Sequence, residues 1–125
     1  MKLSNRQIGA VGVSRVASAL FRLGYSVLAP LEDFAGYDLV AEKNGRFVRI
    51  QVKASSSLEL GRNRYGFVTH CGSGCRGRYS SSVDWMVFYA IDQDLFWIRK
   101  TKDMRLKTLK LEAKTGSSWR ILSDL

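Results

Sequence analysis

Several residue types are scarce in this sequence. Its 125 residues include one proline, one histidine and two cysteines. A bridge between Cys71 and Cys75 would close a very small loop, so we expect free thiols and a reducing compartment. His70, Cys71 and Cys75 supply only three candidate zinc ligands, in a spacing that fits no closed zinc pattern. These scarcities argue against a disulfide scaffold, a structural zinc site and histidine-based acid–base catalysis.

Long hydrophobic runs are also missing. No stretch approaches the roughly 18 apolar residues of a membrane span. The first six residues are polar and lack the apolar core of a signal peptide. The hydrophobic share of 46% is ordinary for a globular protein, and we see no repeat, low-complexity tract or linker. We therefore expect one cytoplasmic domain over residues 1–125, without membrane contact.

Acidic residues are few, and the excess of basic residues is concentrated. The formal charge of +9 comes from 20 lysines and arginines against 11 acidic residues. Residues 61–79 carry Arg62, Arg64, Arg76 and Arg78 and no acid. Residues 99–110 carry six basic residues, including Lys100, Lys102 and Arg105, against Asp103. These two segments account for the whole excess, which favours a polyanionic partner such as nucleic acid over a merely solvated basic surface.

The most clearly defined unit is a β-hairpin. Residues 37–43 and 46–54 are strand-like and flank Asn44-Gly45, a strong signal for a two-residue turn. The turn sets the register, in which Lys43 lies opposite Arg46 and Asp38 lies opposite Gln51. Side chains alternate along each strand. One face is then apolar and suits a core under the first helix, whereas the other carries Asp38, Arg49, Gln51 and Lys53.

This polar face matches the needs of metal-assisted phosphodiester hydrolysis. Asp38 can be the metal carboxylate, Gln51 an amide oxygen ligand and Val52 a backbone carbonyl ligand, which suits a hard cation such as Mg²⁺. Lys53 can orient the attacking water and balance charge on the phosphate. A half-solvated structural hairpin would show the same alternation, so the pattern alone leaves both interpretations open.

The other elements predict a mixed fold. The spacing of apolar residues predicts a helix over 5–24, capped by Ser4 or Asn5 and ended by Gly24. Strands are expected at 25–29 and at 64–70, the latter as a third strand of the hairpin's sheet, and a second hairpin at 85–91 and 95–99. Residues 71–79 read as a basic loop, 80–84 as a loop or helical turn, 101–107 as helix and 108–113 as strand. The fold class is α/β (α+β), with an N-terminal helix, a mixed sheet and a flanking helix.

These motifs together resemble the PD-(D/E)XK nuclease superfamily. The hairpin motif reads Tyr37-Asp38 and then Gln51-Val52-Lys53, and the helix with Gly9, Gly12 and Gly24-Tyr25 is similar to the family's opening. The run Tyr79…Val83-Asp84-Trp85…Phe88-Tyr89 is similar to a later family motif. The branch with Gln in the second motif resembles intron-associated homing endonucleases and archaeal Holliday-junction resolvases. The resemblance implies a restriction-endonuclease-like core and covers roughly residues 8–98.

One departure concerns the helix. Where the family carries a glutamate that reaches the metal site, this chain has Val13. Glu42 lies four residues from Asp38, about 13 Å at strand rise, and does not substitute; only Glu32 or Asp33, in a loop, remains as a candidate. A natural loss and a deliberate silencing substitution would look the same here.

The sequence therefore predicts a DNA endonuclease that uses Mg²⁺ or Mn²⁺, with Asp38, Gln51 and Lys53 as catalytic residues. The expected DNA contacts are Arg62, Arg64, Arg76, Arg78, Lys100, Lys102 and Arg105. The substrate would be double-stranded or branched DNA, and a homodimer or homotetramer is expected because a double-strand cut needs two sites. The alternative is a DNA-binding protein that keeps the nuclease fold with impaired or no catalysis, because Val13 replaces the glutamate.

Overall fold

The computed structural model describes residues 2–32, 36–68, 83–101 and 108–125. The predicted basic loop at 71–79, both cysteines and nearly all of the predicted helix at 101–107 lie outside these ranges. Within the described residues, no helix combines the length and apolar character needed to cross a membrane.

The chain opens with helix α1, Asn5–Arg22. Ser4 is the N-cap: its hydroxyl accepts from the Gln7 backbone N–H at 3.2 Å, and the Gln7 side chain accepts from the Ser4 N–H at 2.7 Å. This reciprocal capping box satisfies two of the N–H groups that a helix start leaves unpaired. The predicted helix ran two residues too far, because the chain turns at Gly24, whose φ of 92° ends the helix.

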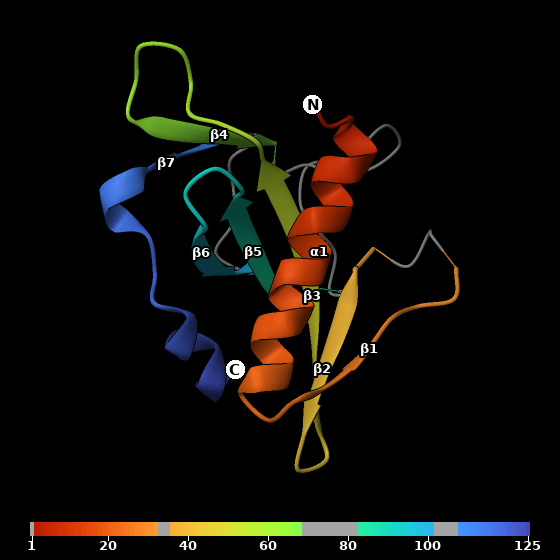
Figure 1. The fold of residues 1–125 in the computed structure, drawn as a ribbon. Helices are drawn as coiled ribbons and strands as arrows, with labels where there is room; N and C mark the ends of the chain where they lie inside the picture. Colours follow the sequence, from red (N-terminus) through yellow and green to blue (C-terminus); the bar gives the residue numbers. More distant parts are fainter. Residues whose placement is uncertain (1, 33–35, 69–82, 102–107) are drawn as a thin grey trace.

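A five-stranded mixed sheet forms the centre of the molecule (Figure 1). Its strands are β1 Ser26–Leu28, β2 Leu39–Lys43, β3 Arg46–Ser55, β5 Trp85–Ala90 and β6 Leu95–Lys100, in the order β1-β2-β3-β5-β6. The β3–β5 pair is parallel and the other pairs are antiparallel. Both predicted hairpins are confirmed.

The β2–β3 hairpin has the predicted register. Lys43 lies opposite Arg46 and Leu39 opposite Ile50. Asn44 and Gly45 have φ values of 55° and 81°, and positive values at both central residues define the turn type that matches strand twist. The turn is also held by Glu42, whose carboxylate accepts the Gly45 N–H at 2.8 Å.

The strand predicted at 64–70 is present, but the prediction that it joins the hairpin's sheet was wrong. Strand β4, Arg64–Val68, pairs with β7, Thr108–Glu112, in a separate two-stranded sheet. The second edge of β3 is occupied by β5 instead. Tyr65 and Phe67 of β4 are buried against the main sheet, with ring centroids 5.7 Å from Trp97 and 5.2 Å from Phe88. The predicted strand at 108–113 is confirmed as β7, and short 3₁₀ helices η2, Ala113–Thr115, and η3, Trp119–Asp124, follow it.

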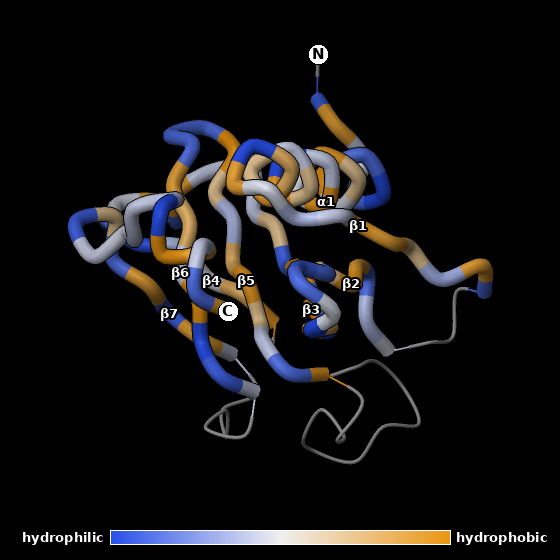
Figure 2. Tube along the Cα trace, turned by 90° about the horizontal axis from the view of Figure 1, so that it is seen from below, coloured by the Kyte–Doolittle hydropathy of each residue, from blue (hydrophilic) through white to orange (hydrophobic). Residues whose placement is uncertain are grey.

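The main sheet is covered on both faces. Helix α1 lies on one face (Figure 2), where its buried residues pack with Ile50 and Val52 of β3 and with neighbouring strands. The β4–β7 pair packs on the other face over Met86, Phe88 and Trp97. The predicted apolar hairpin face under the first helix is therefore confirmed, and the polar face of β3 lies beside the second cluster.

Candidate active site

Asp38 sits where the β2–β3 ladder ends. Its backbone N–H donates to the Ile50 carbonyl at 2.9 Å. Its carboxylate Oδ2 accepts the backbone N–H of Val52 at 2.8 Å. Because the next residue, Leu39, is buried in the core on the α1 side, alternation places Asp38 on the opposite face. The hairpin thus fixes this carboxylate beside the middle of β3.

Gln51 and Lys53 lie on the same face of β3. The alternating residues Ile50 and Val52 are buried under α1, so Gln51 and Lys53 point to the other side, where both are half-buried. Their partners in the parallel register are Met86 and Phe88, which belong to the second core cluster. The structure therefore brings the three predicted catalytic residues to one face, next to an apolar wall.

Burial perturbs the titration of the two charged residues. Partial burial raises the pKa of Asp38, against the opposing effects of the Val52 N–H and the positive charge of Lys53. Burial likewise lowers the pKa of Lys53, against the opposing charge of Asp38. Each group lies in the field of the other. A carboxylate and an amine with pKa values shifted toward neutrality are typical of functional sites.

The oxygen donors suit one hard divalent cation. Carbonyl groups alternate along a strand, and since the Ile50 carbonyl faces Asp38, the Val52 carbonyl faces the same edge. Asp38, the Gln51 amide and the Val52 carbonyl are oxygen donors of the kind that Mg²⁺ or Mn²⁺ prefers. The described residues contain no group of three or more His, Cys, Asp or Glu that could hold a metal. This donor set, with one carboxylate, fits a cation that keeps several of its waters.

Helix α1 packs closely on β3 but adds no carboxylate. A Cβ at Gly12 would lie 2.8 Å from Ala54 Cβ and 3.4 Å from Val52 Cγ1. Val13 is partly buried and packs against the core on the α1 side. No acidic residue occurs in the helix, and the carboxylate of Glu42 caps the hairpin turn. Glu32 is exposed, and Asp33 lies outside the described residues.

The predicted DNA-contacting residues are only partly described. Arg62 is exposed, Arg64 donates to Glu59 at 3.0 Å, and the Lys100 amine lies 5.6 Å from the ring centroid of Trp85. The remaining members, Arg76, Arg78, Lys102 and Arg105, lie outside the described residues. Their role in DNA binding stays a prediction.

One pair on the same face was not assigned from sequence. The Arg49 guanidinium donates to both carboxylate oxygens of Asp84, at 3.1 and 3.0 Å. Strand alternation places Arg49 on the face of Gln51. The sequence placed Asp84 in a family-like motif but did not pair it with Arg49, because the contact depends on the parallel pairing of β3 with β5, residues 35 apart in the chain.

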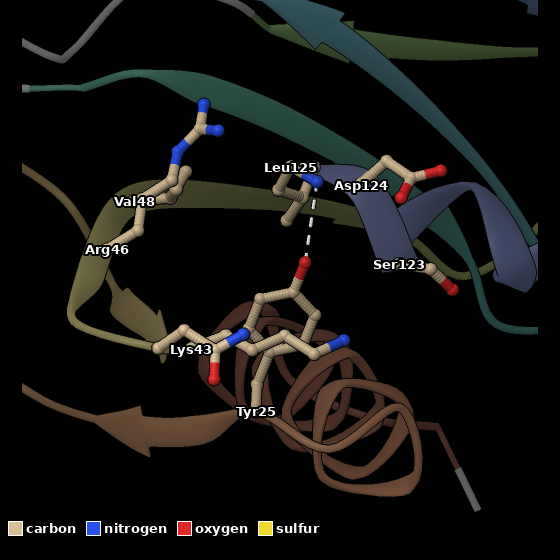
Figure 3. Close-up of a pocket in the computed structure, with 8 residues that line it drawn as sticks. Tyr25, Lys43, Arg46, Val48, Ser123, Asp124 and Leu125 are labelled. Carbon is tan, nitrogen blue, oxygen red and sulfur yellow. Dashed lines mark hydrogen bonds between the residues drawn. The ribbon is translucent and has the colours of Figure 1, made fainter.

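Two cavities lie near these elements. One, of about 350 Å³, adjoins Lys53 between the first turns of α1 and the end of β3, and is lined by Asn5, Ile8, Gly9, Val52, Lys53, Ala54, Ser55 and Ser56. The other surrounds Tyr25 (Figure 3), where the Tyr25 hydroxyl accepts the Leu125 N–H at 3.3 Å and Lys43 lies over the ring. The second contains none of the predicted catalytic residues and lies between the hairpin and residues 123–125.

Comparisons with known proteins agree with this fold. A family model described as PD-(D/E)XK endonuclease matches residues 3–120. The structure of the bacterial homing endonuclease I-Ssp6803I is similar, with a TM-score of 0.76 at 20% identity, over 98% of this chain and 93% of that chain. The Holliday junction resolvase Hjc of the archaeal hyperthermophile Archaeoglobus fulgidus has a TM-score of 0.57 at 10% identity, over 92% of this chain and 94% of that chain. No curated protein sequence matches the chain.

Proposed function

Because the chain belongs to the PD-(D/E)XK endonuclease family, we propose that it is a divalent-metal-dependent DNA endonuclease. Asp38, Gln51 and Lys53 are its catalytic residues, and Asp38, Gln51 and the Val52 carbonyl hold Mg²⁺ or Mn²⁺. The observation that carries this proposal is the common face of β2 and β3, on which Asp38 and Lys53 lie in each other's field. A purely structural hairpin has no need to bury both charges beside an aromatic cluster.

The chain's own residues supply orientation and charge. The Val52 N–H holds the Asp38 carboxylate at the strand edge, which keeps its remaining lone pairs directed away from the ladder. The Lys53 ammonium stabilises negative charge that develops on the phosphate, and its lowered pKa favours proton exchange with water. The cation, when bound, would polarise the phosphate and lower the pKa of a bound water.

The decisive experiment compares Asp38→Asn and Lys53→Met with the parent protein. The Asn side chain keeps an oxygen for the Val52 N–H, so the fold should survive. We expect cleavage of linear duplex DNA with Mg²⁺ to fall at least about 100-fold in each variant, with DNA affinity largely retained. Asp124→Asn and Lys114→Gln, which change exposed residues elsewhere, are the matched controls. Full cleavage by both site variants would refute the assignment.

Val13 supports a second candidate, a DNA-binding protein of the same fold that does not cut. Calorimetric titration with Mg²⁺ separates the two functions. Binding near millimolar Mg²⁺ that disappears in Asp38→Asn supports the nuclease, whereas no binding supports the second candidate. DNA binding itself is tested by salt: affinity should fall with a log–log slope of about −0.9 per phosphate contact.

The substrate class and assembly are part of the proposal. The branch of the family that this chain resembles favours duplex or branched DNA as the substrate. Parallel cleavage assays on a linear duplex and a four-way junction distinguish homing-type cutting from junction resolution. Two cuts require two sites, so we propose a homodimer or homotetramer. Sedimentation of the protein with and without DNA tests this assembly.

A further inference from the structure

The polar row on β3 extends beyond the catalytic residues. Phe47, Arg49, Gln51 and Lys53 alternate on the face opposite α1, with about 6.6 Å between successive members at strand rise. Arg49 is therefore the neighbour of Gln51 in this row. A nucleic-acid strand laid along β3 from the proposed metal ligand Gln51 would reach Arg49 next, about 6.6 Å away.

Asp84 holds Arg49 in a defined orientation. It accepts the Arg49 backbone N–H at 2.8 Å, Nε at 3.1 Å and Nη2 at 3.0 Å, and its own N–H donates to the Arg49 carbonyl at 3.0 Å. A guanidinium has five N–H donors. Two are used in this pair, so three remain directed away from Asp84. The two side chains are 39% and 38% exposed, which leaves the free edge of the guanidinium accessible.

An open notch adjoins this pair. It has a volume of about 490 Å³ and is lined by Arg46, Phe47, Val48, Val83, Asp84, Trp85 and Lys100. Phe47 is 61% exposed, which is unusual for a phenylalanine on a strand. The Lys100 amine lies over the Trp85 ring. Aromatic faces next to amines and guanidinium groups suit a nucleotide, because bases stack on rings while phosphates bind the cations.

We infer, on the basis of the proposed nuclease function, that Arg49 binds the DNA phosphate next to the one hydrolysed and that the notch accommodates the adjoining sugar and base. Asp84 orients the guanidinium so that its free edge meets the phosphate, as a fixed fork does best. Phosphates of one strand are separated by more than the axial rise of about 3.4 Å, because the backbone winds around the axis. The step of about 6.6 Å along β3 between Gln51 and Arg49 also exceeds this rise. Arg49 can therefore reach the phosphate next to the one at the metal.

The competing explanation is that the pair only fastens β5 to β3. Salt dependence distinguishes the two, because a structural ion pair contributes nothing to counterion release. Binding of a short fluorescent duplex would be measured in EDTA over a range of salt, so that the result does not depend on catalysis. Arg49→Gln should lower the magnitude of the salt slope by about 0.9, and Arg49→Lys should keep it. Arg22→Gln, on the exposed side of α1, should leave it unchanged.

Two further variants sharpen the test. Asp84→Asn keeps one oxygen that accepts from Arg49, so the guanidinium stays oriented, and removes a negative charge beside the bound phosphate. It should therefore bind DNA at least as tightly as the parent with an undiminished slope. Phe47→Ala should weaken binding about tenfold with the slope unchanged. Thermal unfolding checks each fold, and if Arg49→Gln does not fold, Asp84→Asn decides alone: weaker binding there would overturn the inference.

The outcomes separate this inference from the proposed function. An unchanged slope in a folded Arg49→Gln protein that still binds and cuts DNA refutes the phosphate role of Arg49 and leaves the nuclease intact. A parent protein that binds no DNA refutes the proposed function itself.

Discussion

The contact between α1 and β3 predicts that two glycines of one helix respond in opposite ways to alanine. A Cβ at Gly12 would lie 2.8 Å from Ala54 Cβ, whereas a Cβ at Gly9 would meet nothing within 4 Å. Replacing glycine by alanine inside a helix stabilises by about 0.8–1 kcal/mol through helix propensity. At Gly12 this gain is opposed by overpacking, which costs about 1–3 kcal/mol.

We therefore expect Gly9→Ala to raise the free energy of unfolding by about 0.5–1 kcal/mol. Gly12→Ala should lower it by up to about 2 kcal/mol. It should also reduce cleavage, because relief of the clash moves α1 relative to the strand that carries Val52 and Lys53. Urea unfolding followed by circular dichroism measures both changes, with an unchanged slope against urea as the check for two-state behaviour.

Ala54→Gly supplies the internal control. It removes the atom closest to the new methyl group, so the double variant should recover stability relative to the sum of the single changes, with a coupling of about 1 kcal/mol. Equal stabilisation by Gly9→Ala and Gly12→Ala would show that the helix does not approach β3 this closely, and would refute the packing argument.

The remaining predictions concern the site. By resemblance to the family, a carboxylate at position 13 should reach the metal beside Asp38, where the β2–β3 ladder ends. Val13→Glu should therefore increase Mg²⁺ affinity and cleavage rate, whereas the matched change at the exposed Val11 should not. Equal effects of both changes on metal titration and cleavage would contradict this. The lowered pKa of Lys53 should draw the alkaline limb of the pH–rate profile inward from the ordinary value of about 10.4, and Lys53→Arg should move that limb outward. The folded state binds the Asp38 proton more tightly than the unfolded state does. The free energy of unfolding of the metal-free protein should therefore fall as pH rises from about 3.9 through the Asp38 pKa, and Asp38→Asn should remove that loss. An unaltered pH dependence of unfolding in Asp38→Asn would count against the burial of this carboxylate.

Local sequence determined the parts of the fold that depend on near neighbours. The Asn44-Gly45 turn sets the β2–β3 register, because its positive φ values admit only a tight hairpin. Strand alternation then places Asp38, Gln51 and Lys53 on one face, and the capping box of Ser4 and Gln7 begins the helix. Each of these features involves groups within a few residues of one another or within one hairpin.

The features that depend on pairing between segments far apart in the chain followed only from the tertiary structure. Only the fold places β5 rather than β4 against β3, because strand patterns alone do not specify a partner across a long connection. That choice creates the Arg49–Asp84 pair and the aromatic wall beside Lys53. The shifted pKa values of Asp38 and Lys53 follow from the same packing, since removal of water is a property of the assembled layers and of no single segment.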